Sequence, residues 1–206
     1  MKIVGMIPAR MGSQRVKKKN VRLINGRPLI DYALESVYKA NIFDEVYINS
    51  EDEIFTDLAG MYGFNFYKRP EEFSSNTSTN DQFAQDFLLN TECDILIQIL
   101  PTSPFLKDSD IKEFTNFMVK EDLDTLISVE NKQIASVFQG KPVNFDNLKP
   151  NPPSQTMVPV QAYATALMGW NKKVFLKNMH DFGSAYHGGS GKTGYFELKG
   201  LSTIDI

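Results

Sequence analysis

Short apolar runs alternate with amphipathic stretches along most of this chain, and that alternation limits the fold more than any other feature. A short apolar run bounded by turn residues is typical of a buried strand, whereas apolar residues spaced by three and four indicate a helix. Alternating strands and helices favour an α/β protein with a mostly parallel open sheet, covered by helices on both faces in three layers. Strands are predicted at residues 3–7, 45–49, 65–67, 95–100 and 125–129, and helices at 28–40, 52–62, 80–89 and from a cap at 108 or 109 to about 119.

The character of the chain changes after the fifth predicted strand. Residues 131–159 contain few apolar pairs, and four prolines lie between positions 150 and 159. Long segments without regular structure are usually functional or mobile, so we expect an excursion from the sheet that serves as a dimerisation or lid segment. The remaining predicted elements are an apolar stretch at 162–170, a short helix at 174–178, a glycine-rich loop at 187–194 and closing strands at 195–198 and 202–206.

The length and composition exclude several classes of protein. The 206 residues suit a single domain spanning 1–206 with a small appendage. One cysteine cannot form an internal disulfide, and together with two histidines it cannot supply a His/Cys zinc site. No apolar run approaches the roughly 20 residues of a membrane helix, and the N-terminal residues lack the long apolar stretch of a signal peptide. We therefore expect a soluble, cytoplasmic protein with no membrane partner.

Positive charge is concentrated at the start of the chain. Residues 1–30 contain eight basic residues and no acidic residue, whereas the rest of the chain carries 14 basic and 25 acidic residues. A basic cluster on an otherwise acidic chain indicates a local anion site rather than a surface for nucleic acid. Two other interpretations stay open. The cluster could be a solvated surface loop, or the lysines at 17–19 could contact RNA with a steep salt dependence.

The basic cluster includes a loop between the first predicted strand and the first predicted helix. In α/β sheets, ligands bind at the carboxyl ends of the strands, which is where this loop lies. Gly12 and Ser13 allow a tight turn with exposed backbone N–H groups that suit phosphate oxygens. Arg10 can bind two oxygens at once, while Lys19 acts as a point charge. The loop therefore predicts a site for a triphosphate or a similar polyanion.

Five segments resemble, in order, the motifs of one enzyme family. The loop pattern Arg10-x-Gly12-Ser13-x5-Lys19-Asn20 is similar to the signature of the acylneuraminate (CMP-sialic acid synthetase-like) cytidylyltransferases. The resemblance implies a nucleotide-diphospho-sugar transferase-like fold, a single nucleotidyltransferase domain and a homodimer. The other four segments are Ser50-Glu51-Asp52, Lys68-Arg69-Pro70 followed by 74–77, Leu100-Pro101-Thr102-Ser103-Pro104, and Ser202-Thr203-Ile204-Asp205-Ile206.

The resemblance also implies roles for individual residues. Arg10 and Lys19 would act catalytically and, with Ser13, would hold the triphosphate of CTP. Cytosine and ribose would lie near Asn20 and the segment 79–80. Residues 74–80 could instead form only a turn and a helix cap, and Arg69 could be a structural ion-pair residue. The implied nucleotide-binding set is Ala9, Arg10, Gly12, Ser13, Lys19, Asn20, Arg69, Thr79 and Asn80, and the sugar-binding set is Gln98, Thr102 and Ser103.

The reaction implied by the resemblance is nucleotidyl transfer. The anomeric hydroxyl of an acidic sugar attacks the α-phosphate of CTP, and pyrophosphate leaves. Charge builds up on phosphoryl oxygens, so positioning and cationic groups supply most of the catalysis. Mg²⁺ is a hard ion held by one or two carboxylates and by phosphates, and Asp205 is the predicted catalytic metal ligand. The alternative to an active enzyme is a nucleotide-binding homologue that serves as a sensor or subunit without turnover.

Two positions near the expected nucleotide and sugar depart from the family pattern. Gln14 replaces a lysine, and Arg15 or Lys17 could supply the missing charge. Leu100 replaces a glutamine that faces the sugar. Gln98 lies two residues earlier on the same strand face, so it could substitute for that glutamine.

Two further departures concern the acceptor and the metal. Ala164 and Ala166 occupy positions where the family has an arginine and an asparagine. A pocket that loses such polar partners binds the same ligand far less well, so we expect an acidic sugar other than N-acetylneuraminate or a different way of holding the sugar. The family's second metal-binding Asp would follow one position after Ile206, so the sequence leaves open a truncated chain or a site with fewer protein ligands.

Overall fold

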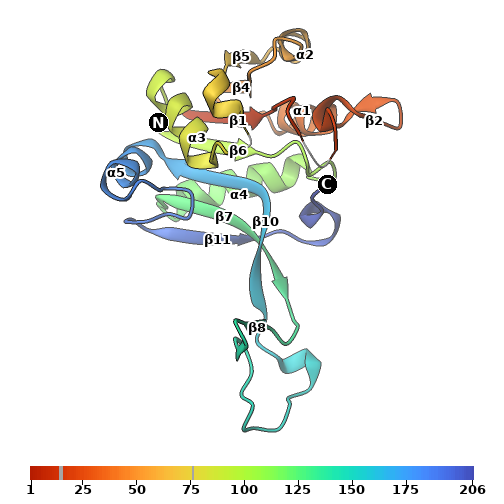
Figure 1. The fold of residues 1–206 in the computed structure, drawn as a ribbon, viewed down its shortest axis with the longest axis vertical. Coiled ribbons are helices and arrows are strands. Elements are labelled where there is room, and N and C mark those ends of the chain that lie inside the picture. The colour runs from red at the N-terminus through yellow and green to blue at the C-terminus, as the bar shows by residue number, and fades with distance from the viewer. Residues whose placement is uncertain (14–15, 76) are drawn as a thin grey trace.

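The computed structural model describes residues 1–13, 16–75 and 77–206. Its central element is a seven-stranded sheet with the strand order β11-β7-β10-β6-β1-β4-β5 (Figure 1). Neighbouring strands run parallel except for β10, which is antiparallel to both β6 and β7. The mostly parallel open sheet predicted from the sequence is therefore confirmed. The strands of this sheet are β1 (Ile3–Pro8), β4 (Glu45–Ser50), β5 (Asn65–Lys68), β6 (Ile95–Ile99), β7 (Thr125–Lys132), β10 (Val160–Asn171) and β11 (Thr193–Glu197).

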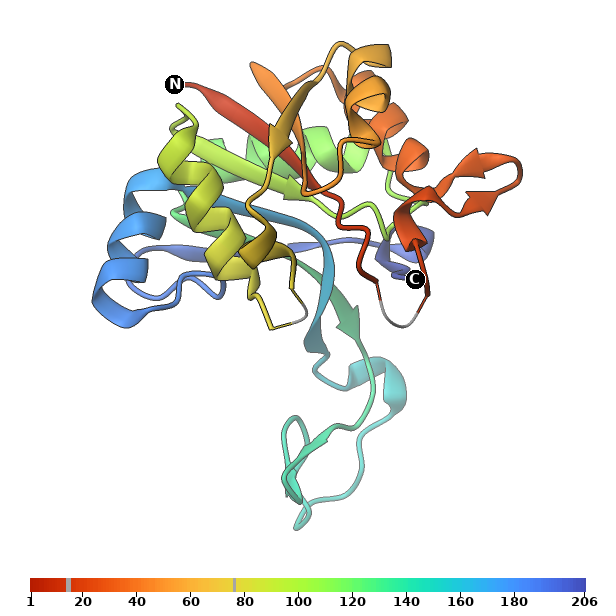
Figure 2. The same cartoon turned by 45° about the horizontal axis from the view of Figure 1, so that its top comes forward.

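Helices cover both faces of this sheet, which gives the predicted three layers (Figures 1 and 2). Helices α1, α2 and α4 share one hydrophobic core with Ile7 and Ile97, whereas α3 and α5 share a second core with Met6 and Leu96. The division follows from strand geometry, because successive side chains point to opposite faces. The described helices are too short or too polar to cross a membrane. Their bounds are α1 (Leu29–Ala40), α2 (Phe55–Met61), α3 (Asn80–Asn90), α4 (Asp108–Lys120) and α5 (Lys172–Phe182).

Local sequence explains where the central strand and two of the helices begin and end. Strand β6 is buried along its whole length, as expected for an apolar strand covered on both faces. Thr79 and Gln82 form a capping box at the start of α3. The side chain of Asn171 caps α5, and Gly183, at φ 70°, ends it in the left-handed conformation that glycine adopts without strain. Two short strands, β2 (Leu23–Ile24) and β3 (Arg27–Pro28), form a hairpin before α1.

Two elements near the C-terminus differ from the sequence prediction. The helix predicted at 174–178 is longer in the structure, where it is α5. The Asn171 cap starts it earlier, and it ends only just before Gly183. The strand predicted at 202–206 is not formed, and a 3-10 helix, η4 (Gly200–Thr203), takes its place. The amide of Leu198 still bonds to the carbonyl oxygen of Val129 on β7. Gly200, at φ 60°, then turns the chain away from the sheet.

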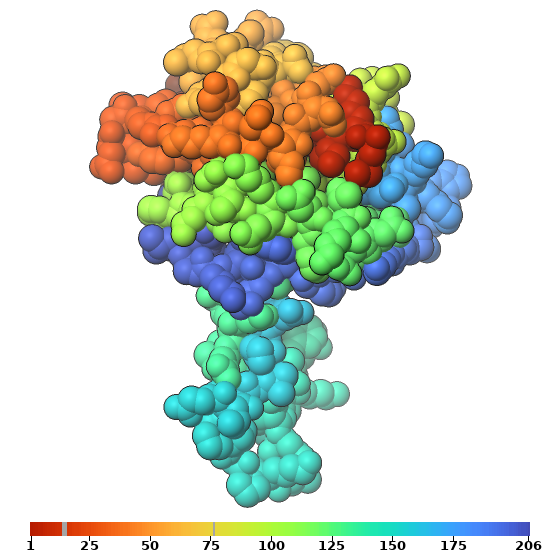
Figure 3. Space-filling view, turned by 180° about the vertical axis from the view of Figure 1, so that it is seen from behind, coloured from red at the N-terminus to blue at the C-terminus, as the bar shows by residue number. Residues whose placement is uncertain are grey.

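Residues 133–159 protrude from the sheet between β7 and β10, and we call this segment the arm (Figures 1 and 3). The excursion was expected from residue 131, but β7 continues to Lys132. The arm contains β8 (Val137–Phe138), β9 (Lys141–Pro142) and a 3-10 helix, η3 (Ser154–Thr156). Six of its large apolar side chains are solvent-exposed, including Leu148 at 93%, whereas Met157 is buried. The six exposed side chains are Ile134, Val137, Phe138, Val143, Leu148 and Val158.

Candidate functional site

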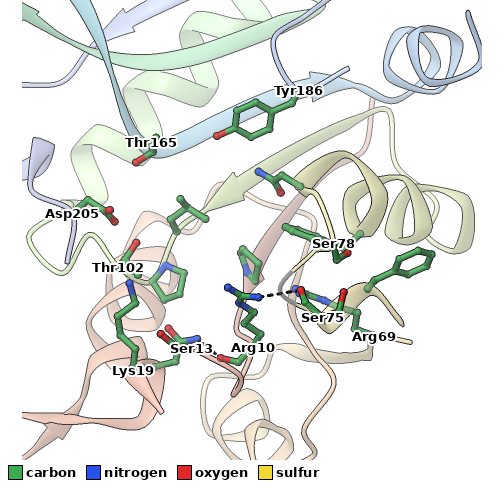
Figure 4. A pocket seen from close by; sticks show the side chains of 17 residues that line it. Arg10, Ser13, Lys19, Arg69, Ser75, Ser78, Thr102, Thr165, Tyr186 and Asp205 are labelled. Atoms are coloured by element: carbon green, nitrogen blue, oxygen red, sulfur yellow. Dashed lines mark hydrogen bonds between the residues drawn. The ribbon is translucent and has the colours of Figure 1, made fainter. Parts of the chain in front are cut away.

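A cavity of about 490 Å³ opens at the carboxyl ends of β1 and β6 (Figure 4). Ligands of open α/β sheets bind at this edge, and the volume lies in the range of roughly 300–1,000 Å³ that small-molecule sites occupy. The cavity walls come from the loop after β1, the segment from the end of β5 into α3, the loop after β6, the middle of β10, the loop between α5 and β11, and the C-terminal residues. The fold therefore brings together six regions that are far apart in the sequence.

The loop after β1 is tied to its surroundings by hydrogen bonds to two other segments. The Arg10 guanidinium donates to the carbonyl oxygen of Ser75 at 3.1 Å, and the Asn20 side chain donates to the carbonyl oxygen of Arg10 at 3.0 Å. The amide of Met11 donates to the Glu51 carboxylate at 2.7 Å. These contacts hold the Arg10 side chain at the cavity (Figure 4).

Arg69 is a buried cation at the cavity wall. Its side chain is 2% exposed, and its guanidinium donates to the side-chain oxygen of Asn49 at 2.6 Å and to the Asn49 carbonyl at 2.9 Å. The guanidinium also lies over the Phe83 ring, 4.2 Å from its centroid. Burial lowers the pKa of Arg69 to about 10, with Glu51 acting in the opposite direction, so the side chain stays charged at pH 7. Among the described residues, no carboxylate forms an ion pair with it.

The backbone of Tyr186 is held at the opposite side of the cavity by the side chain of Asp81 on α3. The amides of Ala185 and Tyr186 both donate to one carboxylate oxygen of Asp81, at 2.6 and 2.7 Å. Burial raises the pKa of Tyr186, while a side-chain hydrogen bond from Asn80 lowers it. Tyr186 therefore presents a neutral hydroxyl to the cavity at pH 7.

The two sides of the cavity differ in charge. Arg10, Lys19 and Arg69 lie along one side, and Thr165 and Tyr186 lie along the other (Figure 4). A phosphate chain is stabilised by the first side, because guanidinium and ammonium groups pair with phosphate oxygens. The second side offers hydroxyl groups without charge. The cavity is therefore suited to a polyanion on one side and a polar, hydroxyl-bearing molecule on the other.

Asp205 closes one end of the cavity, beside Thr102 and Lys19 (Figure 4). The Lys19 ammonium donates to the main-chain oxygen of Ile206. The amide of Ile206 donates to the Thr102 carbonyl at 3.0 Å. These bonds place the carboxylate of Asp205, which is exposed, within the same cavity as the cationic side chains of Arg10, Lys19 and Arg69.

Most of the residues predicted from the sequence lie at this cavity. The structure brings together residues from all the predicted functional sets, although it does not by itself assign their roles. Those that line the cavity are Arg10, Ser13, Lys19, Asn20, Arg69, Asn80, Thr102 and Asp205.

Five predicted residues lie outside the cavity lining. Gln98 is on the predicted strand face, but its side chain is completely buried in the middle of the sheet and does not reach the cavity. Ser103 and Ala9 are also buried, Gly12 is in an exposed part of its loop, and the hydroxyl of Thr79 accepts the Gln82 amide as a helix cap. Neighbouring residues therefore cover the side chains of Gln98 and Ser103, and the sugar-binding role implied for them stays a prediction.

Sequence reasoning missed Thr165 and Tyr186 as site residues. No glycine or proline marks the bend in β10 at Thr165, and Tyr186 is placed at the cavity by contacts with distant residues such as Asp81 and Trp170. Gln14 and Arg15, where we expected a change in the phosphate-binding loop, lie outside the described residues.

The fold and the cavity define an α/β protein whose parallel strands lead into a cavity with cationic side chains along one side. Residues 4–158 match the family model described as cytidylyltransferase, and the chain belongs to that family. The family resemblance seen in the sequence motifs is therefore confirmed.

Comparisons with individual proteins agree with this assignment. The chain is 27% identical over 166 residues to the N-acylneuraminate cytidylyltransferase of Escherichia coli O18:K1:H7, a match that covers 80% of this chain and 35% of that protein. The chain thus spans about a third of that relative's length. It is 32% identical over 112 residues to the 3-deoxy-manno-octulosonate cytidylyltransferase 2 of Hydrogenovibrio crunogenus, covering 54% of this chain and 45% of that protein.

A solved structure shares the fold over nearly the whole chain. It is that of a CMP:2-keto-3-deoxy-manno-octonic acid synthetase in complex with CTP. The TM-score is 0.73 at 14% sequence identity, and the match covers 96% of this chain and 91% of the other. The two proteins therefore have the same architecture, which confirms the fold predicted from the resemblance.

Proposed function

We propose that this protein transfers CMP from CTP to an acidic sugar and releases pyrophosphate. The observation that carries the proposal is the buried Arg69, which faces the cavity together with Arg10 and lacks an ion-pair partner among the described residues. An unpaired buried charge is unfavourable, so the site is arranged to be completed by an anionic ligand. Membership of the cytidylyltransferase family identifies CTP as the anion to test first.

In the proposed reaction, the anomeric hydroxyl oxygen of the sugar attacks the α-phosphorus of CTP and loses its proton. The bond from the α-phosphorus to the oxygen that bridges it to the β-phosphate breaks, and pyrophosphate carries away that oxygen. Arg10, Lys19 and Arg69 bind the phosphates and stabilise the negative charge that develops on them. Ser13 and Asn20 add uncharged donors to the same side of the cavity.

Asp205 is suited to hold Mg²⁺ that enters with the nucleotide. It is the one carboxylate among the described cavity residues, and no cluster of three potential metal ligands exists in the described part of the chain. Mg²⁺ is commonly held by one or two carboxylates together with substrate phosphates, so a single Asp205 fits that mode. When bound, the ion would neutralise part of the phosphoryl charge.

The acceptor is proposed to be an acidic sugar other than N-acetylneuraminate. Ala164 and Ala166 are 5% and 0% exposed, so the corresponding part of β10 offers the acceptor neither a cation nor an amide from these positions. The uncharged Thr165 lies between them at the cavity. This arrangement favours an acceptor bound largely through its hydroxyl groups.

A substrate screen tests this function. The purified protein is incubated with Mg²⁺, each of the four nucleoside triphosphates, and a panel of nonulosonic and octulosonic acids, and pyrophosphate is measured. We expect release with CTP and at least one acid, and none with the other nucleotides. Tight CTP binding with no release for any acid would instead support the sensor or subunit alternative.

We also propose that the arm mediates a homodimer. Six large apolar side chains of the arm are solvent-exposed, and exposed apolar patches commonly mark interaction sites.

Changing both Val137 and Phe138 to aspartate is expected to shift the protein to monomers, raising the dimer dissociation constant at least about 100-fold, because charges would be buried at the interface. Light scattering after gel filtration measures the change. Met61→Asp, at an exposed apolar residue outside the arm, is the control; a wild-type monomer at micromolar concentration would contradict the proposal.

A further inference from the structure

Strand β10 contains a bulge at the cavity. Between the pairs Tyr163–Val129 and Met168–Ile127, β10 advances by five residues while β7 advances by two. The ladder to β6 begins after the bulge, at Leu167, and the carbonyl oxygen of Ala166 accepts the Leu100 amide at 2.9 Å. The bulge is thus held on both sides by hydrogen bonds. Bulges next to binding sites commonly redirect a side chain.

The bulge holds Thr165 in a conformation that is unfavourable for this residue type. Its φ is 55°, in the left-handed region, where a β-branched residue is a genuine outlier. Such strained residues persist only where the surrounding structure imposes them, and they cluster at functional sites. Both neighbours of Thr165 in the sequence are buried alanines, whereas Thr165 itself is half-buried and lines the cavity. The strain therefore coincides with the presentation of one hydroxyl group to the cavity.

Thr165 lies on the side of the cavity away from the phosphate-binding cations. Arg10 and Arg69 are across the cavity from it, and Tyr186 is beside it (Figure 4). If the triphosphate lies against the cations, the molecule that attacks it approaches from the uncharged side. We propose that Thr165 binds the acceptor sugar through its hydroxyl group and that the strained backbone conformation is retained for this contact. The inference rests on the proposed transfer reaction.

Three substitutions separate the hydroxyl contact from the backbone strain. Thr165→Val keeps the shape and removes the hydroxyl, and it is expected to raise the KM for the acceptor about tenfold, as loss of one hydrogen bond would. Thr165→Ser keeps the hydroxyl and should retain acceptor KM within about threefold of the wild type. Thr165→Gly removes both the hydroxyl and the strain. It should raise acceptor KM like the valine variant while raising the thermal midpoint by about 2–4 °C.

Measuring the KM for CTP in the same variants tests whether the acceptor is the molecule in contact with Thr165. The KM for CTP is expected to change less than about twofold in all three variants, because the lost bond lies on the acceptor side. Asp122→Gly is the matched control, since Asp122 has φ 49° but is exposed and outside the cavity lining. It should leave the KM for the acceptor unchanged.

The outcomes distinguish this inference from the proposed function. If the wild-type protein turns over but Thr165→Val keeps the wild-type KM for the acceptor, the inference alone is overturned. It is also overturned if the KM for CTP rises in Thr165→Val as much as the KM for the acceptor. A lower thermal midpoint in Thr165→Gly would overturn the claim of strain. If 3-deoxy-manno-octulosonate, N-acetylneuraminate and the other acids all fail with the wild-type protein, the proposed function and this inference both fail.

Discussion

Changing Arg69 to methionine is expected to weaken CTP binding by about 100-fold, which corresponds to about 2.8 kcal/mol. A buried guanidinium interacts strongly with phosphate oxygens, because little water screens it. Methionine fills a similar volume without a charge, so the loss reports the anion contact more than a cavity. Calorimetric titration with CTP, with no acceptor present, measures the change.

For the protein without CTP, we expect the same substitution to have little effect on stability. Removing the charge relieves the cost of burying it, but it also leaves the side-chain oxygen of Asn49 without its Arg69 donor, while the Asn49 carbonyl keeps only the bond from the Ala9 amide. We expect the two effects to offset each other, so that the thermal midpoint changes by less than about 3 °C. Lys68→Met is the control, because Lys68 is adjacent in the chain but pairs with Glu53 on the surface. An Arg69→Met protein that keeps wild-type CTP affinity would show that Arg69 is only structural.

The second large effect is expected at Asp205. Changing Asp205 to asparagine should lower kcat by about 100-fold, since the cavity would lose its one described carboxylate and with it the proposed protein ligand for Mg²⁺. A higher Mg²⁺ concentration should be needed for half-maximal activity. Initial rates measured across a Mg²⁺ series, at saturating CTP and acceptor, give both quantities.

Asp205 is exposed, so its loss should not affect folding. The thermal midpoint of the Asp205→Asn protein is therefore expected to match the wild type. Glu197→Gln removes an exposed carboxylate of β11 outside the cavity lining and should leave the rate and the Mg²⁺ dependence unchanged. Unaltered kcat and Mg²⁺ dependence in the Asp205→Asn protein would remove Asp205 from the proposed metal site.

Features that depend on local sequence were predictable. The apolar run at 95–100 predicted the central strand because a strand covered on both faces needs apolar residues throughout. Thr79 caps the helix that was predicted at 80–89. The basic loop after the first strand was placed at the site because chain order alone puts it at the carboxyl end of β1.

Features that depend on contacts between distant segments were not predictable. The bulge at Thr165 forms where β10 pairs with β6 and β7 on its two sides, and its own residues give no signal for a positive φ. Alternation placed Gln98 on the correct strand face, but only the packed structure shows that its side chain is covered. The strand predicted at 202–206 does not form, because Gly200 turns the chain away from β7.

The most direct test of the central claim is to follow the phosphorus atoms of CTP by ³¹P NMR during a reaction with Mg²⁺ and the acid that is most active in the substrate screen. We expect the three CTP resonances to disappear while a phosphodiester resonance of a CMP-sugar and a pyrophosphate resonance grow in equal molar amounts. CTP resonances that stay unchanged across every acid in the screen, with calorimetry showing that CTP is bound, would contradict the central claim.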